Sequence, residues 1–103
     1  MDFHLPGSGL ADLYGTPKKN ILAQVVADEL ILLDVVGGGY YGLDPVGARI
    51  WQILSDGRSA AEVLAELLAE YDVDESRARQ DLLALLTDLN ARGLLELHGL
   101  TPT

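Results

Sequence analysis

The chain has 103 residues, 49% of them hydrophobic, which suffices for one small domain with its own core and excludes a disordered chain. With 16 acidic and 7 basic residues the net charge is −9, which disfavours nucleic-acid binding, and the lack of cysteine excludes disulfides and thiol catalysis. There is no hydrophobic run of membrane-spanning length and no signal-peptide pattern at the N-terminus, so we expect a cytoplasmic protein without membrane contact.

The first part of the chain, residues 1–19, is rich in glycine and proline and has no hydrophobic period. This composition predicts a flexible N-terminal arm, either a plain disordered tail or a segment that docks on the domain or its partner. Residues 20–98 carry regular patterns and are expected to form the folded domain. A tail over residues 99–103 follows it.

Three β-strands are expected at the start of the domain. Ile21–Val26 and Glu29–Val35 are rich in branched residues and are separated by Ala27-Asp28, a tight turn. After three glycines at 37–39, Tyr40–Leu43 predicts a short third strand. The second strand is apolar on both faces, so we expect it in the middle of an antiparallel meander or covered on both sides.

Two helices are expected to follow. Asp44 and Pro45 are typical of a helix start, and Gly57 ends this first helix. Ser59 and Glu62 have the spacing of a capping box, which predicts the start of the second helix. Glutamates at every fourth position, 62, 66 and 70, are expected to form its solvated face.

Asp74 caps a third and longest helix that runs to about Arg92, and Gly93 suits its left-handed C-terminal position. Leu94–Leu97 predicts a brief final strand. The fold class is therefore α+β: a winged-helix-like domain with a three-stranded antiparallel sheet, three helices and a short C-terminal strand.

Residues that could carry catalysis or hold a cofactor are scarce. The only histidines, His4 and His98, lie in the expected tails, and no pair of residues has metal-ligand spacing. The glycines at 37–39 join two strands, whereas a phosphate-binding loop leads from a strand into a helix. We therefore expect no catalytic residue, no metal site and no cofactor.

Two features point to a binding site instead. In the third helix, Leu83 falls outside the core stripe, with Arg79 and Asn90 on the same flank. The third strand, with glycines beside two tyrosines, is typical of a sheet edge that accepts a peptide as an added strand. The alternatives are an ordinary exposed leucine and a strand whose Tyr41 and Leu43 only face the core.

The ordered set of residues at 40–51, 57–63, 71–82 and 86–95 resembles the PqqD family. It begins with the strand-to-helix junction Tyr40–Trp51 and continues through Gly57-Arg58-Ser59 and Tyr71-Asp72-Val73 to Gly93-Leu94-Leu95. Family members are chaperones that bind the leader part of a ribosomally made precursor peptide. They present it to a modifying enzyme, such as a radical SAM enzyme in quinone-cofactor synthesis or a leader peptidase in lasso-peptide synthesis.

The resemblance implies that a leader peptide adds to the third strand and packs against the third helix. The helical face is our choice from periodicity. The expected peptide-binding residues are Gly39, Tyr40, Tyr41, Gly42, Arg79, Leu83, Leu86 and Asn90.

Other functions and partners stay open. One is a winged-helix DNA-binding regulator that uses Arg77, Arg79 and Gln80, although the acidic residues of the same helix oppose it. Another is an acidic scaffold subunit of a biosynthetic complex. A homodimer formed by strand exchange is also open, because the apolar second strand and the long arm would permit it.

Overall fold

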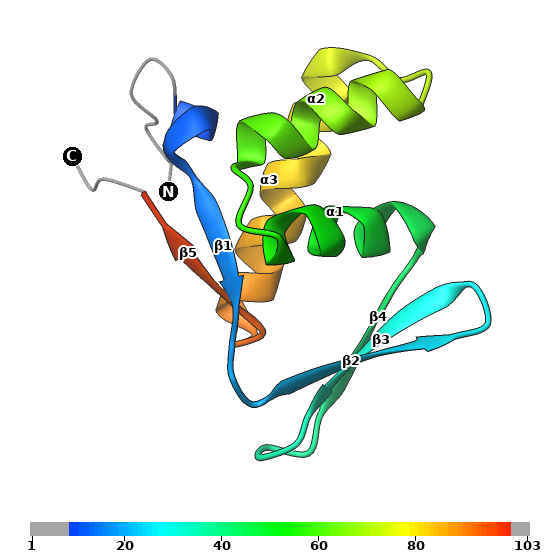
Figure 1. The fold of residues 1–103 in the computed structure, drawn as a ribbon, viewed down its shortest axis with the longest axis vertical. Coiled ribbons are helices and arrows are strands. Elements are labelled where there is room, and N and C mark those ends of the chain that lie inside the picture. The colour runs from blue at the N-terminus through cyan, green and yellow to red at the C-terminus, as the bar shows by residue number, and fades with distance from the viewer. Residues whose placement is uncertain (1–8, 100–103) are drawn as a thin grey trace.

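The computed structural model describes residues 9–99 and contains a short 3-10 helix, five strands and three α-helices (Figure 1). Their order along the chain is η1 (Gly9–Asp12), β1 (Tyr14–Pro17), β2 (Ile21–Val26), β3 (Glu29–Asp34), β4 (Tyr40–Leu43), α1 (Pro45–Ser55), α2 (Ala60–Glu70), α3 (Glu75–Ala91) and β5 (Leu95–His98). The predicted α+β order of three antiparallel strands, three helices and a final strand is confirmed. Within residues 9–99, no helix is long and apolar enough to cross a membrane.

The segment before β2 differs from the prediction of a flexible arm. Residues 1–8 lie outside the described part, but β1 pairs antiparallel with β5, and Leu10 and Leu13 are buried in the core. A Cβ on Gly15 would lie 2.9 Å from a methyl of Leu95, so glycine lets the two strands approach closely. The prediction is therefore wrong for residues 9–17, because this strand is too short to show a hydrophobic period. Of the predicted tail 99–103, only Gly99 is described.

The meander β2-β3-β4 forms as predicted, with β3 in the middle. Ala27, in the tight turn after β2, has a φ of 56°. The β3–β4 turn is held by Asp34, whose side chain accepts hydrogen bonds from the backbone N–H groups of Val36 and Gly37 and from the Asn20 amide. These donors, Gly37 first, lower the pKa of the Asp34 carboxyl. The start of β4 is thereby fixed.

The three α-helices begin at the predicted caps. The side chains of Asp44, Ser59 and Asp74 accept hydrogen bonds from the first turns of α1, α2 and α3, and Ser59 and Glu62 form the predicted capping box. Gly93 ends α3 with a φ of 74°, as expected. The core lies between the helices and one face of the sheet, and its fully buried side chains include Leu32, Ile53, Leu82, Leu86 and Leu89.

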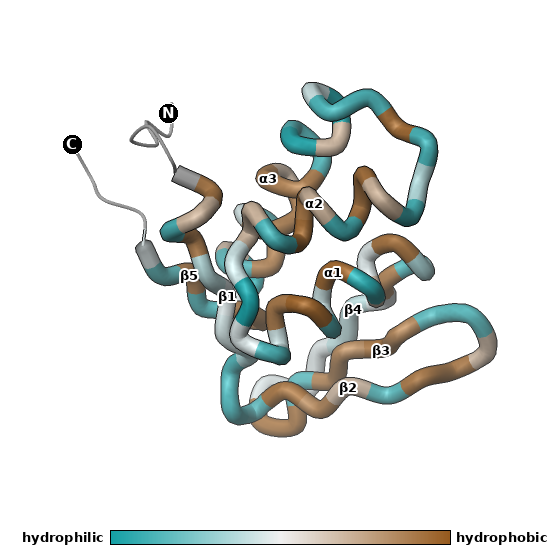
Figure 2. The backbone as a smooth tube through the Cα atoms, turned by 45° about the horizontal axis from the view of Figure 1, so that its top comes forward, coloured by the Kyte–Doolittle hydropathy of each residue, from teal (hydrophilic) through white to brown (hydrophobic). Residues whose placement is uncertain are grey.

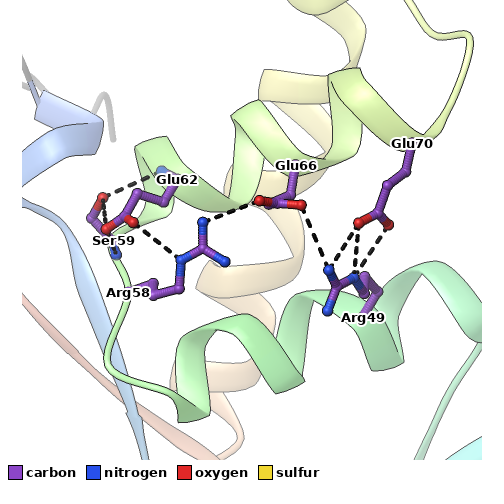
Figure 3. A network of polar contacts seen from close by, with 6 residues as sticks. All are labelled: Arg49, Arg58, Ser59, Glu62, Glu66 and Glu70. Atoms are coloured by element: carbon purple, nitrogen blue, oxygen red, sulfur yellow. Dashed lines mark hydrogen bonds and ion pairs between the residues drawn. The ribbon is translucent and has the colours of Figure 1, made fainter.

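Figure 3 shows how α1 and α2 are joined at their surface. Arg49 of α1 donates to Glu70 at 2.8 Å and also lies 3.6 Å from Glu66, while Arg58 pairs with Glu62 and Glu66. The glutamate stripe is therefore more than a solvated face, because its carboxylates bind two arginines across the α1–α2 corner. The hydrogen bond between Arg49 and Glu70 lowers the pKa of the Glu70 carboxyl and raises the pKa of the Arg49 guanidinium.

The three-stranded sheet β2-β3-β4 is covered on one face only. Helix α1 contacts β3 and β4, whereas the opposite face has no covering element among the described residues. In Figures 1 and 2 the three strands lie beneath α1, and hydrophobic residues continue along β2 and β3. The strands β2 and β4 form the two edges of this sheet.

Candidate functional site

A groove of about 630 Å³ runs beside β4 and is walled by all three helices. Its position follows from the topology, because β4 is an edge strand and leads directly into α1, while the first half of α3 lies across from it. The lining residues are Glu29, Tyr41, Gly42, Leu43, Asp44, Val46, Gly47, Ile50, Leu67, Tyr71, Val73, Arg77, Ala78, Asp81, Leu82 and Leu85.

The edge of β4 offers backbone groups for hydrogen bonding. Asp34 N–H donates to Gly39 O, and hydrogen-bonded pairs alternate along an antiparallel ladder. Tyr41 and Leu43 therefore bond toward β3, whereas the N–H and C=O groups of Tyr40 and Gly42 point away from the sheet. An extended peptide could use these free groups as a further strand.

The floor of the groove is apolar. Ile50, Leu67 and Leu82 come from three different helices and are each at most 4% exposed, while Leu85 and Tyr71 are half-buried at its side. Each helix contributes residues of its apolar stripe, at the point where the stripe is left uncovered beside β4. Burying this apolar surface away from water is favourable, so the groove can receive one or more apolar side chains.

The rim of the groove carries both charges, with acidic groups in excess. Asp44 caps α1 by accepting from Gly47 N–H at 2.8 Å, and Glu29 lies at the start of β3. On α3, Arg77 Nε lies 3.4 Å from Asp81. A bound segment with at least one basic residue would suit this rim, although exposed pairs add little affinity.

A second contact holds β4 against α3. Tyr41 OH donates to Asp88 Oδ2 at 2.9 Å, and Arg92 lies over the Tyr41 ring while pairing with Asp88 at 3.0 Å. Burial and this hydrogen bond raise the pKa of Tyr41, while the Tyr41 and Arg92 donors lower the pKa of Asp88. The contact of Tyr41 with Asp88 of α3 and with Arg92 therefore fixes the β4 edge at one end of the groove.

The structure brings together only part of the predicted site. Tyr41 and Gly42 line the groove, and Gly39 and Tyr40 precede them on the same edge, with Tyr40 78% exposed on the uncovered face. The helical half does not line it. Arg79 pairs with Glu75, and Leu86 is 1% exposed within the core.

The chosen flank of α3 lies beside β5 at its C-terminal end. Asn90 accepts a hydrogen bond from Leu97 N–H of β5, and Leu83 packs against the core without reaching the groove. The helical wall is instead made by Arg77, Ala78, Asp81, Leu82 and Leu85. Periodicity showed that leucines extend past the core stripe, but it does not tell which flank of the helix meets β4.

Other chemistry is sparse in the described residues. His98 Nε2 lies 3.1 Å from Thr16 Oγ1 between β5 and β1, and His4 lies outside the described part. Among residues 9–99, no group of three or more histidines and carboxylates could hold a metal ion. The arginines of the DNA-binding alternative, Arg77 and Arg79, each pair with an acidic residue of α3.

The fold is similar to two solved structures. A structure of TbiB1 in complex with the TbiA(beta) leader peptide has a TM-score of 0.74 and 36% identity, and covers 79% of this chain and 94% of its own. A structure of a lasso peptide synthetase B1 complexed with the leader peptide has a TM-score of 0.74 and 33% sequence identity. The matched region covers 82% of this chain and 98% of the chain in that structure.

The sequence also matches a known family. Among curated proteins, no relative matches. The model of the family described as coenzyme PQQ synthesis protein D, PqqD, matches residues 29–95, which run from the start of β3 to the start of β5. The matched part contains β4, the groove and all three helices. The chain therefore belongs to the PqqD family.

Proposed function

We propose that this chain is a non-catalytic peptide chaperone, which binds the leader of a ribosomally made precursor peptide and delivers it to a modifying enzyme. One observation carries the proposal: the free edge of β4 borders an apolar groove walled by α1, α2 and α3. A peptide that lies along β4 could thus form backbone hydrogen bonds with the strand and place its side chains in the groove.

The leader would bind as an added strand next to β4. Tyr40 and Gly42 would supply the hydrogen bonds, since their N–H and C=O groups point away from β3. Alternate leader side chains would enter the groove, where Leu82 and Leu85 form the helical wall. The hydrogen bonds would give affinity for any extended segment, and the groove would select the sequence.

Both similar structures contain a leader peptide, and one is described as a lasso peptide synthetase B1. This supports a leader as the ligand and a lasso-peptide pathway as the setting. The enzyme partner would then be a leader peptidase rather than a radical SAM enzyme. A cytoplasmic location, where precursor peptides are made, belongs to the same proposal.

The direct test is a titration of this protein into a fluorescently labelled leader, taken from the precursor peptide encoded nearest its gene. We expect saturable anisotropy with a dissociation constant of about 1 μM or lower, and no saturation with a shuffled leader of equal composition. If the folded protein binds neither peptide, the chaperone proposal is wrong. Co-purification with the enzyme would then favour the scaffold role, and salt-sensitive retention on DNA the regulator.

A further inference from the structure

The two lysines of the chain and two of its acidic residues lie at opposite ends of β2. Within residues 9–99 every arginine forms an ion pair, whereas Lys18 and Lys19, just before β2, form none. Asp28 and Glu29, just after β2, are likewise absent from the ion pairs of this part of the chain. One edge strand is thus flanked by unpaired cations at one end and unpaired anions at the other.

The strand between these charges is an unprotected edge. Ile21–Val26 contains no charged residue, no proline and no glycine, and in the described residues it pairs with β3 alone. Leu22, Val25 and Val26 are 52%, 72% and 56% exposed. Soluble proteins usually blunt such an edge with charges, prolines or bulges, so an unblunted edge is available for pairing with another chain.

Free backbone groups alternate along this edge as well. Val35 N–H donates to Asn20 O, which continues the β2–β3 ladder and fixes which residues bond inward. Ala23 and Val25 therefore direct both their N–H and their C=O outward. Ile21 also faces outward, but its N–H already donates to Lys18 O, so only its carbonyl is free.

We propose that β2 of a second copy of this chain pairs antiparallel with β2. The two-fold axis passes between the two Gln24 residues, which lie opposite each other. In this register Ala23 lies opposite Val25 of the second copy, and each pair exchanges both backbone hydrogen bonds. On the uncovered face, Leu22 lies opposite Val26 of the second copy, and the two Gln24 amides face each other.

Charge complementarity selects a second copy as the occupant. In the same register the residues just before β2 lie beside the turn that ends β2 in the second copy, so Lys19 of each copy lies near Asp28 of the other, and the two-fold axis repeats this contact at the other end. A net charge of −9 makes two copies repel elsewhere, but β2 itself carries no acid. A register centred on Ala23 would place Leu22 opposite the polar Gln24, which gains less from cross-strand contact.

The resulting sheet has the strand order β4-β3-β2-β2-β3-β4, with the two β4 edges outermost. Both grooves stay open, because they border β4 and not β2. The inference therefore does not rest on the proposed function, and such a dimer would offer two leader-binding edges.

Sedimentation velocity over about a hundredfold range of protein concentration tests the dimer. We expect a reversible monomer–dimer equilibrium, which Gln24→Lys shifts to monomer by placing two like charges on the axis. Val36→Lys, at a residue 82% exposed in the β3–β4 turn, is the matched control and should leave the dimer intact. A wild-type monomer at all concentrations, or a dimer that survives Gln24→Lys, would overturn the proposal.

Cysteine cross-linking tests the register, because the chain has no cysteine of its own. The two Gln24 residues form a non-hydrogen-bonded pair, whose Cα atoms lie about 4.5 Å apart, within disulfide range. Gln24→Cys should therefore oxidise to a covalent dimer, and Val36→Cys should not. Equal cross-linking of the two variants, or none with Gln24→Cys, would overturn the register, while leader titration of the same variants reports on β4 separately.

Discussion

The two edges of the three-stranded sheet differ in what lies beside them. The β4 edge borders a groove with an apolar floor and is fixed by Tyr41 and Asp88, whereas β2 has exposed aliphatic side chains and charges only at its ends. Both edges offer backbone hydrogen bonds, so the backbone does not distinguish them. The side chains decide the partner: β4 suits a peptide whose side chains fill a groove, and β2 suits a copy of itself.

The largest effect should come from the groove wall on α3. Leu85→Lys places a charge beside Leu82 at the groove and should weaken leader binding by about 30-fold or more, as expected for an anchor position. Leu83→Lys is the matched control, because Leu83 is also half-buried but lies outside the groove. It should leave leader affinity within about twofold and lower stability by about 1–2 kcal/mol. Anisotropy and urea unfolding measure the two effects, and the reverse ranking of affinities would place the site on the other flank.

Proline substitutions that each disrupt only one edge strand should have the next largest effect. Gly42→Pro removes an N–H that points away from β3, so we expect leader affinity to fall by about tenfold while the fold persists. Ala23→Pro does the same to β2 and should spare leader binding but abolish the dimer. Anisotropy and sedimentation of both variants measure this, with circular dichroism as the control for folding. Equal loss of leader binding in the two variants would contradict a role specific to β4.

A smaller effect is expected where β4 meets α3. Tyr41→Phe removes the hydrogen bond to Asp88 but keeps the ring beneath Arg92, so the melting temperature should fall by about 2–5 °C. Tyr40→Phe, at a side chain 78% exposed, should leave it unchanged. Calorimetry on the two variants compares them directly, and equal melting temperatures would show that the Asp88 contact contributes nothing.

The smallest effect concerns acid. The folded-state pKa of Glu70 lies below its ordinary value of 4.5 because Arg49 donates to it, so the unfolded state takes up the proton first as the pH falls. This contribution is present above about pH 4.5 and is lost as the pH falls through the folded-state pKa. Glu70→Gln should therefore flatten the acid side of the stability curve, measured by urea unfolding from neutral to acidic pH. Glu96→Gln, at an exposed residue without an ion pair in residues 9–99, should not.

The elements with strong local signals could be predicted from the sequence. Asp44, Ser59 with Glu62, and Gly93 set the helix ends through contacts within a few residues, and the structure places all of them as expected. Strand β1 was missed, because its pairing with β5 joins the two ends of the chain and leaves no local pattern.

The lining of the groove could be predicted only in part, because it depends on packing between elements that are distant in the sequence. The β4 edge could be found from its glycines and tyrosines, but the groove depends on how α3 is turned about its axis. Leu83 and Leu85 extend the core stripe on opposite sides, and only packing against β4 and β5 shows that Leu85 borders the groove. The glutamates of α2 likewise look like a solvated face until α1 brings Arg49 to them.

The central claim is that a leader adds as a strand to β4, and amide hydrogen exchange followed by NMR tests it residue by residue. Adding the leader should slow exchange of the Tyr40 and Gly42 N–H groups, which point away from β3, and leave Ala23 and Val25 unchanged. Protection at Ala23 and Val25 instead, or a bound leader that protects neither edge, would contradict the account.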